Sequence, residues 1–121
     1  MHELSIAVSL VELAVERAAG IGDVRVDAVH VRLGALSGVV EEALRFSFDL
    51  AAGGTPVDGA RLVVERVPVV VFCAACGAER VLAEPLRFRC PVCGAPAGDL
   101  VRGREIELTA LEVDGHAAAD R

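Results

Sequence analysis

The chain has 121 residues, 54% hydrophobic and 25% charged, with a formal net charge of −6, which fits one domain with an ordinary core. All twelve basic residues are arginine, and an acidic chain without clustered Lys and Arg is a poor binder of phosphate backbones, so we expect no nucleic-acid partner. The chain has neither a run of about 18 apolar residues nor a signal-peptide pattern, so we expect no membrane span and a cytoplasmic location.

Residues 4–19 predict an amphipathic helix that ends at Gly20 and Gly22. Its expected buried stripe consists of Leu4, Val8, Val11 and Val15, with Ala7, Ala14 and Ala18 beside them. Residues 24–33 predict a strand. Its apolar phase changes near Asp27, which indicates either a bulge or a strand partly covered on both faces. His30 in this strand is expected to be a structural or surface residue.

A second helix follows the turn at residues 34–38. Its expected buried stripe is Val40, Leu44, Phe48 and Ala51, and residues 53–56 end it. Residues 61–72 predict a second strand. Pro68 removes a backbone donor there, so that end lies at an edge or leaves the sheet. The strand runs directly into Cys73, and residues 104–113 predict a third strand.

The order is therefore helix, strand, helix, strand, metal-binding insertion, strand. The simplest compact solution is an α+β fold, in which two helices pack on a three-stranded sheet. A zinc-ribbon or rubredoxin-like module is inserted before the last strand, and its middle, residues 78–89, is long enough for a short hairpin with Pro85 at the bend. Residues 114–121 are expected to form a disordered tail.

All four cysteines lie in the insertion as two C-x-x-C pairs, Cys73 with Cys76 and Cys90 with Cys93, separated by 13 residues. Two such loops can face each other and form a closed cage of four sulfurs, which is typical of a structural zinc site. A glycine follows each pair, where φ > 0 lets the chain fold back over the metal. Rubredoxin-like iron is the second choice, since ligand type and geometry do not separate it from zinc. Two disulfides or a redox pair are less favoured.

The N-terminal tripeptide is a second candidate metal site. Met1 supplies an α-amine, His2 an imidazole and a backbone nitrogen, and Glu3 a further amide nitrogen. Nitrogen donors in one plane suit Ni(II) or Cu(II). Such binding displaces protons, so it should weaken as the pH falls.

Four motifs in register resemble the hydrogenase nickel-incorporation family, the HypA/HybF type of metallochaperone. They are Met1-His2-Glu3-Leu4-Ser5-Ile6, Arg32-Leu33-Gly34-Ala35-Leu36-Ser37-Gly38-Val39, the two cysteine pairs with Gly77 and Gly94, and Gly103-Arg104-Glu105-Ile106 leading to Leu111-Glu112-Val113. The similarity runs from residue 1 to about residue 113.

The resemblance implies a nickel metallochaperone rather than an enzyme. Ni(II) would be a transferable cargo bound at Met1, His2 and Glu3, and Zn(II) a structural ion bound by Cys73, Cys76, Cys90 and Cys93. It implies a nickel-binding module at residues 1–72 and 95–113 and a zinc-binding module at residues 73–94. The implied partners are a GTPase accessory protein and the large subunit of nickel–iron hydrogenase, and some family members also serve urease maturation.

A zinc-stabilised interaction module without nickel handling is the alternative from another class. An enzyme is poorly supported, because the chain shows no nucleophile–base pair, no phosphate loop and no H-E-x-x-H motif.

Overall fold

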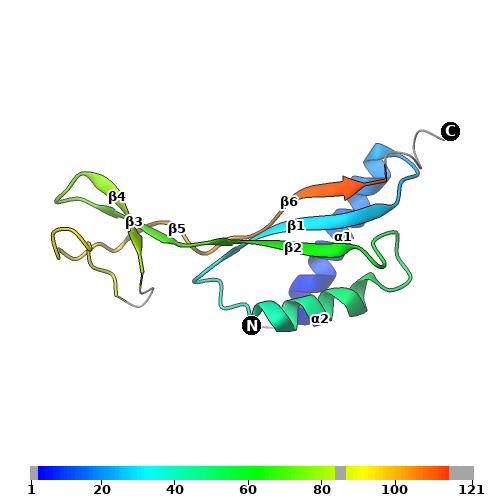
Figure 1. The fold of residues 1–121 in the computed structure, drawn as a ribbon, viewed down its shortest axis with the longest axis horizontal. Helices are drawn as coiled ribbons and strands as arrows, with labels where there is room; N and C mark the ends of the chain where they lie inside the picture. The colour runs from blue at the N-terminus through cyan, green and yellow to red at the C-terminus, as the bar shows by residue number, and fades with distance from the viewer. Residues whose placement is uncertain (1–2, 84–86, 115–121) are drawn as a thin grey trace. The chain divides into compact units, whose positions relative to one another are not determined.

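The computed structural model describes residues 3–83 and 87–114 (Figure 1). Two helices and two three-stranded sheets make up this part of the chain, and they confirm the predicted α+β class. The elements are α1 (Glu3–Ile21), β1 (Val26–Gly34), α2 (Glu41–Ala52), β2 (Arg61–Val67), β3 (Val69–Cys73), β4 (Ala78–Leu82), β5 (Asp99–Arg102) and β6 (Ile106–Val113). One sheet has the order β2-β1-β6 and the other the order β4-β3-β5.

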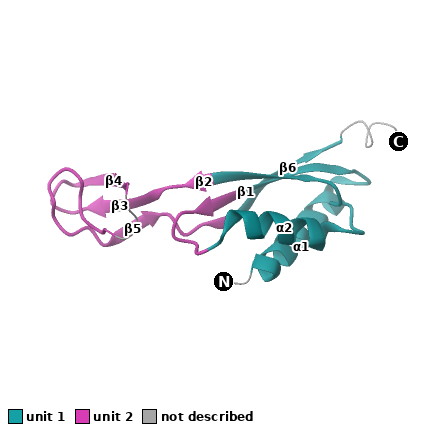
Figure 2. Ribbon diagram, turned by 60° about the horizontal axis from the view of Figure 1, so that its bottom comes forward, with its two compact units in different colours: residues 1–31, 39–65, 107–121 teal, residues 32–38, 66–106 magenta. Residues whose placement is uncertain are grey.

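The chain divides into two compact units (Figure 2). Unit 1 comprises residues 1–31, 39–65 and 107–121, and unit 2 comprises residues 32–38 and 66–106. The described residues leave out three segments: residues 1–2, 84–86 and 115–121. The predicted nickel ligands Met1 and His2 are in the first of these segments, and most of the expected tail is in the last. Which metal each part of the chain handles stays a prediction.

Unit 1 is built around two helices that pack on the first sheet. Its core combines inward side chains of α1, α2, β1, β2 and β6, with Leu44, Phe48 and Val29 fully buried. In β1, both Val26 and Val29 belong to this core although they differ in strand phase. The predicted change of phase near Asp27 is therefore confirmed.

The predicted helix faces need two corrections. Leu4 and Val8 of α1 are 53% and 40% exposed, contrary to the prediction. Val11 is buried as predicted, with Ala7, Ala14 and Ala18 beside it, and Leu10 completes the buried stripe. In α2, Leu44 and Phe48 are buried as predicted, but Val40 is exposed and precedes the helix. Small side chains on α1 allow a close approach, and α1 and α2 contact each other extensively.

The predicted strand over residues 61–72 is wrong as a single element, because the structure divides it at Pro68 into β2 and β3. The two halves belong to different sheets. Proline has no N–H to donate to a ladder, and the chain leaves the first sheet at this residue, as its position predicted.

Unit 2 contains the second sheet, which the sequence did not predict. β3 pairs antiparallel with β4 and also with β5, a strand that sequence analysis missed. Residues 78–89 were expected to form their own hairpin; in the described part of this segment β4 pairs with β3 instead, and Pro85 lies outside the described residues. The small core of unit 2 comprises Val69, Val71, Cys73, Leu82, Cys90 and Ala97.

A second hydrogen-bonded feature of unit 2 is the segment of residues 32–38, whose first three residues are the end of β1. The N–H of Gly34 donates to Glu105 O at 2.7 Å, and that of Ala35 donates to Val67 O at 2.9 Å. The N–H of Leu36 donates to Gly103 O at 2.6 Å. Three consecutive donors therefore fasten this segment to the other chain segments of unit 2.

Candidate metal centre

The four cysteines of the two C-x-x-C pairs come together in unit 2. Their sulfur atoms all lie within 4.8 Å of one another, and all four thiols are free. Cys73 ends β3 and Cys90 follows the loop after β4. Cys73 and Cys90 are buried, whereas Cys93 is exposed. The structure thus brings together every cysteine that the sequence named.

Each pair lies on a tight loop that closes at the glycine after it. The N–H of Gly77 donates to Cys73 O at 2.7 Å, and that of Gly94 donates to Cys90 O at 2.9 Å. The φ angles of the two glycines are 69° and 76°, which confirms the predicted positive values. Backbone N–H groups also point at sulfur, from Cys76 to Cys73 at 3.4 Å and from Cys93 to Cys90 at 3.5 Å.

The sulfur separations fit a tetrahedral ion. Cys73 Sγ lies 3.5 Å from Cys93 Sγ, and Cys76 Sγ lies 3.9 Å from Cys90 Sγ. Metal–sulfur bonds of about 2.3 Å in a regular tetrahedron place the sulfurs about 3.8 Å apart. Four thiol donors at this spacing can hold one metal ion and leave no open coordination position.

The pKa values of Cys90 and Cys93 are shifted in opposite directions. The N–H groups of Cys93 and Val92 lower the pKa of Cys90 to about 6. The N–H of Ala95 lowers the pKa of Cys93, but sulfur contacts led by that of Cys73 outweigh it and raise that pKa to about 11. A metal binds cysteine as thiolate, so loading the centre must displace the proton of Cys93.

Arg80, which was not among the predicted site residues, lies in β4 on the strand face that also carries Cys73 of this centre. Its interactions with the thiol of Cys76 first, and of Cys90 second, raise the pKa of the guanidinium above its ordinary value. Among the described residues, its buried Nε has no hydrogen-bond partner. Only the register of β4 against β3 shows that Arg80 faces inward, and the sequence alone does not give that register.

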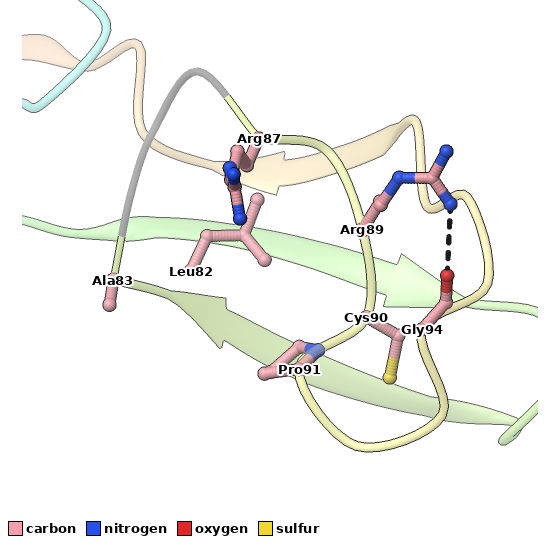
Figure 3. A pocket seen from close by; sticks show the side chains of 7 residues that line it. All are labelled: Leu82, Ala83, Arg87, Arg89, Cys90, Pro91 and Gly94. Atoms are coloured by element: carbon pink, nitrogen blue, oxygen red, sulfur yellow. Dashed lines mark hydrogen bonds between the residues drawn. The ribbon is translucent and has the colours of Figure 1, made fainter.

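A cavity of about 300 Å³ lies beside one loop of the centre (Figure 3). Its lining includes Arg87, Arg89 and Pro91, and of the four cysteines only Cys90. The Arg89 guanidinium donates to Gly94 O at 3.1 Å, so it supports the second cysteine loop. Cys90 is thus the one cysteine that both lines this cavity and belongs to the four-sulfur cluster.

Of the predicted nickel residues, the structure describes Glu3 alone, while Met1 and His2 lie outside the described residues. Glu3 is the first residue of α1. Its Oε2 accepts a hydrogen bond from the N–H of Val40 at 3.1 Å, at the start of α2. The Glu3 carboxylate thus complements the partial positive charge at the N-terminus of α2.

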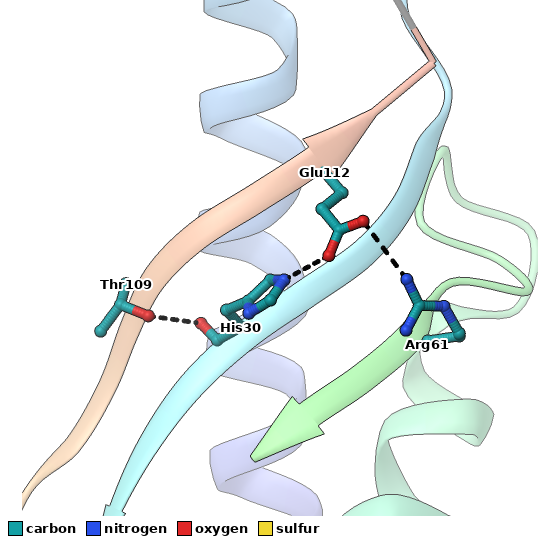
Figure 4. A network of polar contacts seen from close by, with 4 residues as sticks. All are labelled: His30, Arg61, Thr109 and Glu112. Carbon is teal, nitrogen blue, oxygen red and sulfur yellow. Dashed lines mark hydrogen bonds and ion pairs between the residues drawn. The ribbon is translucent and has the colours of Figure 1, made fainter. Parts of the chain in front are cut away.

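His30 takes part in a surface network of unit 1 (Figure 4). Its Nε2 lies 2.6 Å from Glu112 Oε2, and Arg61 lies 3.3 Å from the other carboxylate oxygen. Hydrogen bonding to His30 lowers the pKa of Glu112. His30 is the one histidine in the described part of the chain, and its ion pair with the half-exposed Glu112 agrees with the structural or surface role predicted for it.

These features define a class: a small α+β protein with a four-cysteine metal-binding module. The family model described as "Hydrogenase/urease nickel incorporation, metallochaperone, hypA" matches residues 1–113. The chain belongs to this family, whose role as a maturation factor suggests a non-enzymatic protein.

Relatives in sequence and in structure agree with the family. The chain is 59% identical over 112 residues to a hydrogenase maturation factor HypA of Chloroflexus aurantiacus, covering 93% of this chain and 98% of that one. It is 55% identical over 114 residues to the one of Roseiflexus sp., covering 94% and 93% of the two chains. The solution structure of the Ni metallochaperone HypA from Helicobacter pylori has a TM-score of 0.65 at 24% identity and covers 93% of this chain and 97% of that one, a likeness of fold. In the part of the chain that the structure describes, no helix has both the length and the apolar character needed to span a membrane.

Proposed function

We propose that the chain is a nickel metallochaperone, which binds Ni(II) at its N-terminus and delivers it during maturation of nickel–iron hydrogenase. The observation that carries this proposal is the family match over residues 1–113, which includes the N-terminal tripeptide and both cysteine pairs. Urease is the alternative client, since the family description names both enzymes.

Zinc is the ion we assign to Cys73, Cys76, Cys90 and Cys93. Four sulfur donors within 4.8 Å of one another support a tetrahedral site. With all four positions filled by protein, the ion has no place for water or substrate, so its role is structural. Zinc bound there supplies folding energy to a unit whose own apolar core is small.

Nickel is assigned to Met1, His2 and Glu3, through the terminal amine, the imidazole and backbone nitrogens. Glu3 opens α1, and the first backbone N–H groups of a helix make no intrahelical hydrogen bond. Use of the Glu3 amide nitrogen as a ligand would therefore leave the helical ladder intact. The Glu3 carboxylate contacts Val40, and we assign it a positioning role rather than a place among the ligands.

A terminal site built partly from backbone suits a cargo that must be released. The nickel-binding module is then residues 1–72 and 95–113, and the zinc-binding module residues 73–94. We expect the cargo to pass to the hydrogenase large subunit with help from a GTPase accessory protein. We expect this to occur in the cytoplasm, where thiols stay reduced.

The test is a nickel titration of the protein with its native N-terminus beside a form with one additional N-terminal residue, with zinc counted in both. We expect the native form to bind one Ni(II) per chain and the extended form to bind it far more weakly at equal zinc content. His2→Ala should behave like the extended form and keep its circular dichroism spectrum.

Equal nickel binding by native and extended protein would contradict the assignment of residues 1–3. The chain would then be the alternative, a zinc-stabilised interaction module. Binding that persists in His2→Ala would point to other nitrogen or sulfur donors.

A further inference from the structure

Arg80 occupies an inward position in a pair of strands whose other inward residues are apolar or cysteine. The register of β3 and β4 pairs Val71 with Arg80 and Val69 with Leu82. Side chains two residues apart in a strand share a face, so Cys73 points the same way. The four neighbours on this face are at most 6% exposed. The partly buried side chain of Arg80 therefore leaves β4 on a face whose other side chains are buried.

The outward face of β4 has the opposite character. Val81 is 58% exposed, while Glu79 pairs with Arg102 at 2.9 Å on the surface. Folding for stability alone would place the valine inward and the arginine outward. When a strand departs from the pattern of apolar side chains inward and charged side chains outward, we look for a functional reason.

The surroundings of Arg80 supply that reason. Arg80 shares its inward strand face with Cys73, one of the four clustered cysteines. The thiols of Cys76 first and Cys90 second, one from each C-x-x-C pair, raise the pKa of its guanidinium. Its Nε is buried and has no acceptor among the described residues. A buried N–H of a charged group is costly unless an acceptor faces it, and thiolate sulfur is a far better acceptor than neutral thiol.

We infer that Arg80 is the counter-cation of the metal centre, donating N–H groups to the thiolates of Cys76 and Cys90. This inference rests on the proposed zinc assignment. Four thiolates around one divalent ion leave two negative charges uncompensated, in a unit whose Cys73 and Cys90 are buried. A guanidinium with several donors in one plane can serve two sulfurs at once.

Two consequences follow for the centre. Hydrogen bonds to metal-bound sulfur draw electron density away from it, so Cys76 and Cys90 should react more slowly with electrophiles than they would without Arg80. Charge compensation should also slow the loss of zinc. Arg80 would thus keep the structural ion in a protein whose other metal must be released.

The test compares Arg80→Met with wild type, both loaded with one zinc per chain. Methionine keeps an unbranched apolar side chain beside Val71 and Leu82 but has no charge. We expect Arg80→Met to transfer zinc to a chromogenic chelator about tenfold faster, in line with losses from removing partners of metal ligands. Brief iodoacetamide labelling, mapped by mass spectrometry, should rise at Cys76 and Cys90 more than at the other two cysteines.

Arg102→Met is the matched control, because it removes an arginine of the same unit that pairs with Glu79 on the surface. Arg80→Lys keeps the charge without the planar fork and should fall between wild type and Arg80→Met. The inference would be overturned if Arg80→Met transferred zinc and was labelled no faster than wild type or than Arg102→Met. Wild-type protein that binds no zinc would overturn the zinc assignment itself, which is a different result.

Discussion

Gly34 occupies a position in unit 2 that has no room for a side chain. An ideal Cβ there would lie 2.6 Å from the backbone nitrogen of Arg104 and would overlap the carbonyl of Gly103. Its neighbours are backbone atoms, which cannot move aside like the end of a flexible side chain. Gly34→Ala therefore forces two chain segments apart.

The cost follows from the hydrogen bonds that hold these segments together. Gly34, Ala35 and Leu36 donate three consecutive backbone bonds of 2.7, 2.9 and 2.6 Å. Each such bond contributes about 1 kcal/mol net, and more where a buried group is left without a partner. Loss of all three gives a destabilisation of about 3 kcal/mol, or a fall of roughly 10 °C in Tm.

Urea unfolding of the zinc-loaded protein, followed by far-UV circular dichroism, measures this cost, since the chain has no Trp and no Tyr for fluorescence. Gly98→Ala is the matched control, because a Cβ there meets nothing within 4 Å. We expect Gly98→Ala to lie within about 1 kcal/mol of wild type. Hydrogen exchange should place the loss of protection in Gly34→Ala at residues 66–72 and 99–106. A stability for Gly34→Ala within about 1 kcal/mol of wild type would refute the reasoning.

Three further predictions concern the centre, the core and the surface network. Cys76→Ala should lose zinc and melt unit 2 at a lower temperature; a variant that keeps both zinc content and Tm by circular dichroism would contradict the zinc assignment. Phe48→Ala should cost about 3–5 kcal/mol in urea unfolding, because Phe48 is 0% exposed, whereas Phe46→Ala, at a position 68% exposed, should be nearly neutral. Glu112 has a lowered pKa when folded, so its ionised form stabilises the fold at high pH and this stabilisation disappears as the pH falls below 4.5. The difference in Tm between wild type and Glu112→Gln should shrink over that range, and a difference independent of pH would argue against the pair with His30.

The sequence was sufficient for features that depend on short spacing. Cys73 and Cys76 share one loop, so their spacing and the glycine after them predict the loop without knowledge of the rest of the fold. Pro68 likewise predicts the end of a ladder from the chemistry of one residue. Such features need no information about distant neighbours.

The features that sequence analysis missed depend on partners distant in the chain. In α1 the larger residues Leu4 and Val8 suggested the centre of the buried stripe, but the buried face is centred on the alanines predicted beside them and includes Leu10, which was not predicted. Residues 78–82 do not alternate clearly in polarity, so the inward direction of Arg80 became evident only from the register with β3. Periodicity in the sequence predicts the helices and strands, whereas tertiary packing determines which face of each one is buried.

Glu3 shows how the fold could prepare a terminal metal site without supplying a ligand from its interior. A chain terminus is usually free to move, and fixing ligands in one geometry costs conformational entropy. The bond from the Val40 N–H to the Glu3 carboxylate ties the first residue of α1 to the start of α2. If nickel binds the nitrogens of Met1, His2 and Glu3, this bond orients the last of them before the metal arrives. Selectivity for nickel would then come in part from the preset backbone direction at Glu3.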